Sequence, residues 1–191
     1  TGTVVDIGYQ TTSFVPIYEG FILNHAVTKV DTGGKDLTDY FCQIIGQRPG
    51  NGEFINEGQK SMINELKEKI CEVAEDYDSQ VKKCLDSKII ETHTLPDGSK
   101  VQIAQEKYQC PELLFQPQFF ARDHFGLHEQ TFKSIKRCDE DIEKDLFQNV
   151  ILCGGSSLFL KIRKKFEKEL QSLAPTGKTV KVIAPPERKY S

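Results

Sequence analysis

The sequence lacks an apolar run long enough to cross a lipid bilayer. Its first residues, 1–6, lack the basic start and apolar core of a secretory signal peptide. It also lacks a C-x-x-C pair, which removes the basis for a zinc-ribbon or thioredoxin-type redox site. We therefore expect no membrane span and no site that holds a metal directly through protein side chains.

The sequence also lacks a strong excess of charge of one sign. Its 25 Lys and Arg residues against 28 Asp and Glu residues give a net charge of −3, which argues against a general nucleic-acid binder. Four histidines show no metal-ligand spacing, namely His25, His93, His124 and His128. No P-loop, nucleophile elbow, internal repeat or low-complexity tract is present. We expect no direct contact with nucleic acid, and none of the common catalytic motifs is found.

What is present is a globular composition of 191 residues, with 38% hydrophobic and 28% charged residues. This length suffices for one large domain or two small ones with a real core. Most cysteines sit in apolar stretches, as reduced buried thiols do, which favours a cytosolic or nuclear protein; the six are Cys42, Cys71, Cys84, Cys110, Cys138 and Cys153. Both ends look cut, so we expect a segment of a longer protein.

One stretch, residues 149–165, organises the chain. Val150 to Cys153 is apolar and partly β-branched, as in a buried strand. Gly154 and Gly155 follow, and Ser156 or Ser157 could cap a helix whose apolar face is Leu158, Ile162, Phe166 and Leu170. Such a diglycine is either a tight connection or a place where an anionic ligand approaches bare backbone.

The other predicted elements alternate between strand and helix. Strands are expected at 3–7, 11–16 and 179–183, with further β-prone residues over 17–30. A helix should follow the turn at 31–34, and a long amphipathic helix should carry the apolar positions Met62, Ile63, Leu66, Ile70, Val73, Ala74 and Tyr77. Residues 48–52 form a loop, 89–95 and 100–104 a hairpin around Pro96-Asp97-Gly98, and 110–115 a short helix with its proline near the first turn. An aromatic loop over 116–125 and helices over 127–137 and 139–147 complete the prediction.

This pattern predicts an α/β protein in which a βαβ-type parent carries an inserted, smaller and mostly helical subdomain over roughly residues 33–121. Several blocks then resemble actin, in the same order and with nearly the same spacing along the whole chain. They are Val15-Pro-Ile-Tyr-Glu-Gly20, Lys35-Asp-Leu-Thr-Asp-Tyr40, Lys67-Glu-Lys-Ile-Cys71, Leu95-Pro-Asp-Gly98, Cys110-Pro-Glu112, Leu114-Phe-Gln-Pro117, Cys138-Asp139, Lys144-Asp-Leu146 and Ile183-Ala-Pro-Pro-Glu-Arg-Lys-Tyr-Ser191.

The resemblance covers the second half of an actin and implies the actin/Hsp70/sugar-kinase ATPase fold. It implies a larger subdomain from residues 1–32 and 122–191 and a smaller one from residues 33–121. It also implies ATP or ADP as ligand, together with Mg²⁺ or Ca²⁺, in the intact protein. In this segment alone the cleft would have one wall, so we expect weak nucleotide binding.

Residues 6–12 correspond, by the resemblance, to the family's second phosphate loop. Asp6 and Gly8 match the family pattern, and Asp6 is the one candidate for contact with metal-bound water. Tyr9 and Gln10 stand where actin has an acidic residue and a glycine, and Ser13 replaces a histidine. Without the resemblance the segment is an ordinary hairpin. With it, these departures predict slow or impaired hydrolysis, at most weak ATPase activity in the intact protein, and none in this segment.

The remaining nucleotide contacts that the resemblance implies come from four parts of the chain. They are Gly34 and Lys35 on the ribose side, Lys67 and Glu68 at the adenine and ribose, Gly154, Gly155, Ser156 and Phe159 under the α-phosphate and sugar, and Lys189 beside the adenine. Without the resemblance, Lys67 and Glu68 would be interpreted as a solvated helix face. The central expectation is that these distant glycines converge on one crevice.

The resemblance also implies surfaces for partners, either other actin-like subunits or actin-binding proteins. The candidate interface residues are Tyr18, Phe21, Phe119, Phe120, Phe125, Asp139 and Lys178. The three phenylalanines of the aromatic loop either fold back onto their own core or form a protein interface. Arg122, Asp123 and His124 make this loop more charged than the usual actin version.

Two functions follow from the resemblance and both stay open. The first is a cytoskeletal, nucleotide-binding filament subunit located in the cytoplasm, with the nucleus as a second location. The alternative is a non-polymerising actin-related protein that serves as a structural subunit of a larger complex, associated with chromatin or a microtubule motor. A phosphotransferase of the same superfold is a weaker third, because sugar kinases lack the actin-specific blocks.

Overall fold

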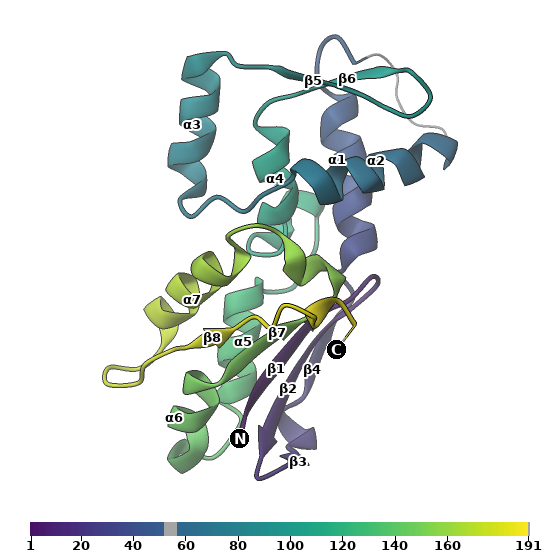
Figure 1. Cartoon of the computed structure of the whole chain (residues 1–191). Helices are drawn as coiled ribbons and strands as arrows, with labels where there is room; N and C mark the ends of the chain where they lie inside the picture. Colours follow the sequence, from purple (N-terminus) through teal and green to yellow (C-terminus); the bar gives the residue numbers. More distant parts are fainter. Residues whose placement is uncertain (52–56, 191) are drawn as a thin grey trace.

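The computed structural model describes residues 1–51 and 57–190. A mixed sheet forms one end of the molecule, and a group of helices with a hairpin forms the other (Figure 1). The sheet has the strand order β3-β2-β1-β7-β8, with β4 paired to β2. Its strands are β1 (Gly2–Ile7), β2 (Thr12–Tyr18), β3 (Phe21–Ile22), β4 (Thr28–Val30), β7 (Val150–Cys153) and β8 (Val182–Ile183).

The first two strands form the predicted hairpin. β1 and β2 are antiparallel, with Ile7 opposite Thr12, and the Gly8 N–H donates to the Thr11 carbonyl at 3.1 Å to close the turn. Buried residues alternate along β2, as expected for a strand with one face on the core. β1 and β7 are parallel, so both strands end at the same edge of the sheet, at Ile7 and Cys153.

Helices cover this sheet. α5 (Leu127–Ile135) and α6 (Glu140–Gln148) both contact β1 and β2, while α7 (Ile162–Leu173) contacts β8 and α5. Short 3₁₀ helices lie between the larger elements: η1 (Asn24–Ala26), η2 (Pro117–Phe120), η3 (Gly155–Leu158) and η4 (Arg188–Tyr190). η1 falls within residues 17–30, where the sequence is β-prone.

The opposite end is built by α1 (Gly34–Gly46), α2 (Glu57–Ile70), α3 (Tyr77–Ser87), the hairpin β5 (Glu91–Thr94) and β6 (Lys100–Ile103), and α4 (Glu106–Glu112). α1 contacts α2, α4 and β6, and α3 contacts α4. These elements lie together in Figure 1. Together with the sheet they give the α/β composition that the sequence predicts, whereas the exact boundaries of two subdomains stay a prediction.

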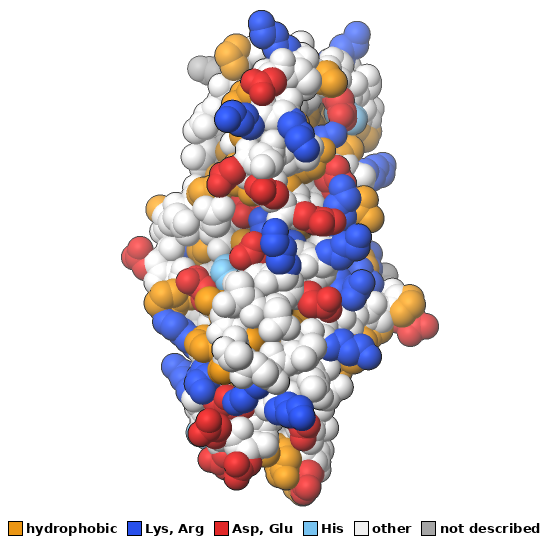
Figure 2. Space-filling view, turned by 90° about the vertical axis from the view of Figure 1, so that its left-hand side faces the viewer, with side chains coloured by type: hydrophobic (Ala, Val, Ile, Leu, Met, Phe, Trp, Pro, Cys, Tyr) orange, Lys and Arg blue, Asp and Glu red, His pale blue; other side chains and the backbone are white. Residues whose placement is uncertain are grey.

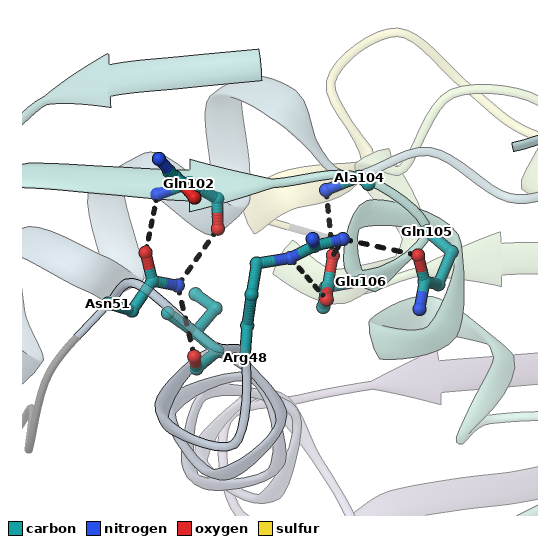
Figure 3. A network of polar contacts seen from close by, with 7 residues as sticks. Arg48, Asn51, Gln102, Ala104, Gln105 and Glu106 are labelled. Atoms are coloured by element: carbon teal, nitrogen blue, oxygen red, sulfur yellow. Dashed lines mark hydrogen bonds and ion pairs between the residues drawn. The ribbon is translucent and has the colours of Figure 1, made fainter. Parts of the chain in front are cut away.

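A polar network joins α1 to the hairpin (Figure 3). The Asn51 amide donates to the carbonyls of Ile45 (3.0 Å) and Gln102 (2.9 Å), and its oxygen accepts from the Gln102 N–H at 2.7 Å. Arg48 pairs with Glu106 at 2.8 Å. Asn51 therefore takes the place of a strand peptide beside β6. The predicted loop over 48–52 is present as far as Asn51, and its last residue lies outside the described part.

One continuous hydrophobic core runs through both ends, from Val5 and Leu152 in the sheet to Phe41 in α1 and Val101 in β6. The described cysteines carry free thiols, all of them buried except the half-buried Cys84, as the sequence predicts. On the face shown in Figure 2, acidic and basic side chains are interspersed from end to end.

The long amphipathic helix was predicted through Tyr77, and this is wrong. α2 ends at Ile70, and α3 begins at Tyr77 with the Asp76 carboxylate accepting the Ser79 N–H at 3.1 Å. Between them, the Glu72 and Val73 N–H groups donate to other segments, at Lys107 and Leu160. Val73 and Ala74 are buried in this connection rather than on a helix, so the apolar spacing continued across a break.

Two helix starts also differ from the prediction. α4 begins at Glu106, so Pro111 lies in its last turn and not in its first. α7 begins at Ile162, because the Ser157 hydroxyl donates back to the Gly154 carbonyl at 2.6 Å and closes the turn η3 instead of capping the helix. Leu158 is consequently outside the apolar face of α7 and is 41% exposed.

Candidate functional site

A cavity of about 600 Å³ opens at the edge of the sheet where β1 and β7 end. Its walls come from the β1–β2 turn, the start of α1, one face of α2, the segment around η3, and η4. The lining residues are Asp6, Gly8, Tyr9, Gly34, Asn64, Lys67, Glu68, Gly154, Gly155, Ser156, Leu158, Phe159 and Lys189. The carboxyl edge of parallel strands is where open α/β sheets bind ligands, and this volume is typical of small-molecule sites.

The start of α1 is joined to the β1–β2 turn by backbone hydrogen bonds. The Gly34 N–H donates to the Gly8 carbonyl at 2.9 Å, and the Lys35 N–H donates to the Tyr9 carbonyl at 2.7 Å. A Cβ on Gly33 would lie 2.7 Å from the Gly8 oxygen, so the approach requires glycine there. Gly8 and Gly34 thus meet at one wall of the cavity, as predicted, although these two amides are already occupied by the protein itself.

Gly154 and Gly155 also line the cavity and differ in their surroundings. Gly154 has φ of +87°, and a Cβ there would lie 2.4 Å from the Ile7 carbonyl oxygen and 2.5 Å from Asp6 Oδ1. A Cβ on Gly155 would meet no atom within 4 Å. Gly154 is therefore required by the fold, whereas Gly155 leaves room beside the cavity that a bound molecule can fill.

Lys67 lies deep in the site, where its ammonium is fully used by the protein. It is 3% exposed and donates to the Gly34 carbonyl at 3.2 Å, Thr38 Oγ1 at 2.9 Å and Asn64 Oδ1 at 3.0 Å. An ammonium has three N–H donors, so all three are taken. Burial lowers the pKa of Lys67. The side chain fastens α2 to the first turn of α1, and we infer that it shapes the cavity more than it contacts a ligand.

Every cofactor-binding residue predicted from the sequence lines the cavity except Lys35. Its side chain is exposed, because the next residue along a helix points about 100° away from the direction taken by Gly34. Phe159 is buried at the cavity wall, and Glu68 accepts from the Asn64 amide at 3.1 Å. The structure therefore brings ten of the eleven together, from five separate stretches of the chain.

Three lining residues were not predicted as ligand contacts, namely Tyr9, Asn64 and Leu158. Asn64 lies three and four residues before Lys67 and Glu68 on α2, and this helical spacing could have revealed it. Tyr9 was noted only as a departure from the family pattern; it is 65% exposed at the turn tip and still borders the cavity. Leu158 was assigned to a helix face, and the 3₁₀ turn moved it to the cavity.

The cavity offers two carboxylates, Asp6 and Glu68, and the side chains of Lys189 and Ser156. Across residues 1–51 and 57–190, no three His, Cys, Asp or Glu side chains gather in a group that could hold a metal ion. None of the helices in the same ranges combines the length and the apolar character that a bilayer-spanning segment needs. The cavity thus presents carboxylate, ammonium and hydroxyl groups to a polar molecule between glycine-lined walls.

None of the predicted partner residues is among those that line the cavity. Phe119 packs against Tyr77 at 5.6 Å and Phe120 against Tyr40 at 5.7 Å between ring centroids, with the rings tilted, so these two fold back onto the chain. Phe125 is 48% exposed, with the Lys133 ammonium over its ring. Two phenylalanines of the aromatic loop thus pack on their own chain, and the third, Phe125, is exposed as an interface residue would be.

The other predicted partner residues are also spread over the surface. Phe21 is 76% exposed on β3, Tyr18 is half-buried, and Asp139 is exposed. The Lys178 ammonium instead forms an ion pair with Glu143, a side chain that also binds Lys136 at 2.7 Å. Lys178 is thereby held within its own chain.

A comparison with models of protein families bears on this geometry. The family model described as Actin matches residues 1–191, the whole of the chain. The match therefore includes all five stretches that line the cavity.

Proposed function

Because this chain belongs to the actin family, we propose that its cavity binds ATP or ADP together with Mg²⁺ or Ca²⁺. Members of this family generally bind these nucleotides with a divalent cation. The single observation that supports the proposal is the convergence of Gly8, Gly34 and the pair Gly154-Gly155 on one cavity of about 600 Å³.

The residues present suit a nucleotide. The open space above Gly155 would take the α-phosphate or sugar without moving the backbone, and the Ser156 hydroxyl lies across from Gly34. Phe159 offers an apolar wall, and Glu68 and Lys189 offer polar groups for the ribose and base. Mg²⁺ keeps several waters and binds through a carboxylate and phosphate oxygens, which suits Asp6 as a contact to metal-bound water.

We propose that hydrolysis is slow or impaired. Tyr9 borders the cavity at the tip of the turn, where the family pattern has a carboxylate that helps to hold metal-bound water. Gln10 and Ser13 replace the family's glycine and histidine on the same hairpin. Each change removes a group that would place metal, phosphate or attacking water, so binding should survive better than catalysis.

The test of nucleotide binding is calorimetric titration of the chain with ADP and with ATP in the presence of Mg²⁺. We expect weak binding by this chain alone, with a Kd above about 1 μM, and protection of amide exchange at residues 8–10, 33–38 and 154–156. The absence of both binding heat and amide protection at millimolar nucleotide would refute the proposed site. A Kd of about 1 μM or below would refute the expectation that this chain alone binds weakly.

For the whole protein we propose a cytoskeletal filament subunit. The exposed apolar strand β3, with Phe21, and the exposed Phe125 support a role in assembly, because large exposed apolar side chains usually mark interfaces. The alternative, a non-polymerising structural subunit of a larger complex, is favoured by the two phenylalanines that fold back and by Lys178, which is paired within the chain.

A pelleting assay on the full-length protein in ATP and salt separates the two functions. Sedimenting polymer with slow phosphate release supports the filament subunit. A soluble monomer that keeps its nucleotide supports the structural subunit.

A further inference from the structure

The start of α1 is a shared wall of the cavity and is held from two sides. On the cavity side it is bound to the β1–β2 turn through Gly34 and Lys35. On the far side its capping carboxylate, Asp36, accepts the Gly33 N–H at 3.1 Å, and the same carboxylate forms an ion pair with Arg122. Asp36 is 8% exposed, and a carboxylate removed from water is costly unless it has such partners.

A second tie lies one turn away. Thr32, the residue before the Gly33-Gly34 pair, joins its hydroxyl to His124 Nε2 at 2.6 Å, while its carbonyl accepts from the Thr12 hydroxyl at 2.7 Å. Arg122 and His124 both come from the short segment after η2, 86 and 92 residues along the chain from their partners. One segment outside the cavity thus holds the glycine turn at two points.

The segment after η2 combines a left-handed backbone position with packing of Arg122 on an aromatic ring. Ala121 has φ of +49°, in the left-handed region that a residue with a Cβ adopts only at a cost in energy. Arg122 also lies over the ring of Phe120, 5.7 Å from its centroid, so its position is fixed by packing as well as by charge. The Ala121 and Arg122 N–H groups also donate to the Gln118 and Pro117 carbonyls, each at 3.2 Å, so the bonds of Arg122 and His124 add to contacts that hold this turn.

We propose that Arg122 and His124 are positioning residues for the nucleotide cavity, acting through Asp36 and Thr32 on the Gly33-Gly34 turn. This inference rests on the proposed nucleotide function and adds a regulatory element to it. Coupling between two sites is reciprocal. A nucleotide that orders the turn must therefore also order residues 121–125, including the exposed Phe125, and a partner bound at Phe125 must change nucleotide affinity by the same factor.

The experiment measures ADP affinity and amide exchange in the intact chain. Arg122→Leu and His124→Gln should each raise the Kd for ADP by about 2-fold to 30-fold, the range for residues that act on a site from a distance. Arg122→Lys should recover part of the loss, because it keeps the charge but not the planar guanidinium. The matched control is Arg137→Leu, which removes one exposed cation that bonds only Thr28 in the described part and should leave the Kd unchanged.

Exchange in the unsubstituted chain gives a readout that a purely structural role would not affect. ADP at about 100-fold above its Kd should slow exchange over residues 121–126 as well as at 33–38, and Arg122→Leu should abolish the first effect while keeping the second. Protection at 8–10, 33–38 and 154–156 without any at 121–126 would overturn the positioning role and leave nucleotide binding intact. The absence of binding heat and of amide protection at all of these residues would overturn both the positioning role and nucleotide binding. Should Arg122→Leu fail to fold, His124→Gln and the unsubstituted chain still decide the question.

Discussion

Gly154 and Gly155 are adjacent but should respond differently to the same substitution. Gly154→Ala places a Cβ 2.4 Å from the Ile7 carbonyl at a positive φ, so we expect a loss of more than about 2 kcal/mol in the free energy of unfolding. Gly155→Val adds atoms to open space, so we expect stability within about 1 kcal/mol of the unsubstituted chain and at least tenfold weaker ADP binding. Urea unfolding and calorimetry measure the two effects.

Each of the two variants is the control for the other, because Gly154 and Gly155 belong to the same turn. Equal loss of stability in both variants would show that Gly155 is also required by the fold. Unchanged ADP affinity in Gly155→Val would remove the α-phosphate from this side of the cavity.

His128 predicts a dependence of stability on pH. Burial lowers its pKa below the usual 6.5, against the smaller opposing effects of Glu129 and Glu169, and its Nδ1 is buried without a partner among the described residues. Below pH 6.5 His128 is protonated in the unfolded chain but still neutral in the folded chain. His128 therefore lowers the free energy of unfolding as pH falls, until the pH passes below its pKa in the folded chain. His128→Phe should remove this share of the acid sensitivity.

The measurement is the difference in unfolding free energy between the two proteins from pH 7.5 to pH 5. As pH falls below 6.5, the unfolding free energy of the variant should rise relative to that of the unsubstituted chain. This difference should become constant at lower pH. Parallel curves throughout would contradict the role of His128, since carboxylates common to both proteins cancel in the difference.

At the scale of elements, Asn51 predicts how firmly the hairpin is attached to α1. Asn51→Ala leaves the Gln102 N–H and carbonyl without their Asn51 partner and removes one of the donors to the Ile45 carbonyl, which keeps the Arg48 N–H (Figure 3). We expect a loss of about 2–3 kcal/mol in unfolding free energy and faster exchange of the Gln102 amide. The matched control is Gln105→Ala, which removes one 3.2 Å bond to Arg48 and should cost less than about 1 kcal/mol. Equal losses would contradict the role of Asn51.

The elements show how far the sequence could go. Strand alternation, the β1–β2 hairpin and the Pro96-Asp97-Gly98 turn follow from local signals, and the structure has all three. The end of α2 does not follow, because Val73 and Ala74 keep a helical apolar spacing while the Glu72 and Val73 N–H groups donate to segments far along the chain. Periodicity records which residues are buried, and it does not record whether the backbone between them stays helical.

The site was predictable only through the resemblance. No local rule brings Gly34 to Gly8, since their contact depends on hydrogen bonds across 26 residues. The Lys35 side chain does not line the cavity. A motif match gives the position of a residue in the sequence, whereas the helix determines the direction in which its side chain points. The ties of Arg122 and His124 could not be foreseen, because they join an aromatic loop to a helix start about 90 residues away.

At the scale of the molecule, a buried ion pair joins the two ends. Lys165 of α7 pairs with Glu112 of α4; their side chains are 5% and 2% exposed, and burial raises the pKa of Glu112. Lys165→Met leaves that carboxylate without its cation and should cost about 3–5 kcal/mol in unfolding free energy. Adding Glu112→Leu should recover most of this loss, because apolar groups often replace a buried pair at little cost.

Urea unfolding of the two single variants and the double variant decides the matter. A double variant as unstable as Lys165→Met would mean that packing, for instance of Lys165 on the Phe115 ring 4.9 Å away, matters more than charge. The loss in Lys165→Met should also shrink at acid pH, where Glu112 becomes neutral. We further propose that residues 33–121 form a subdomain that meets the rest of the chain across this pair.

The ammonium of Lys67 has a consequence for evolution. Its three donors are matched to a main-chain carbonyl, to Thr38 and to Asn64, so a change at any one of these side chains leaves the others with an unmet partner. Descendants of this sequence should therefore alter positions 38, 64 and 67 as a set. A homologue in which only one of these positions has changed should carry a compensating substitution nearby or a different backbone conformation at the start of α1.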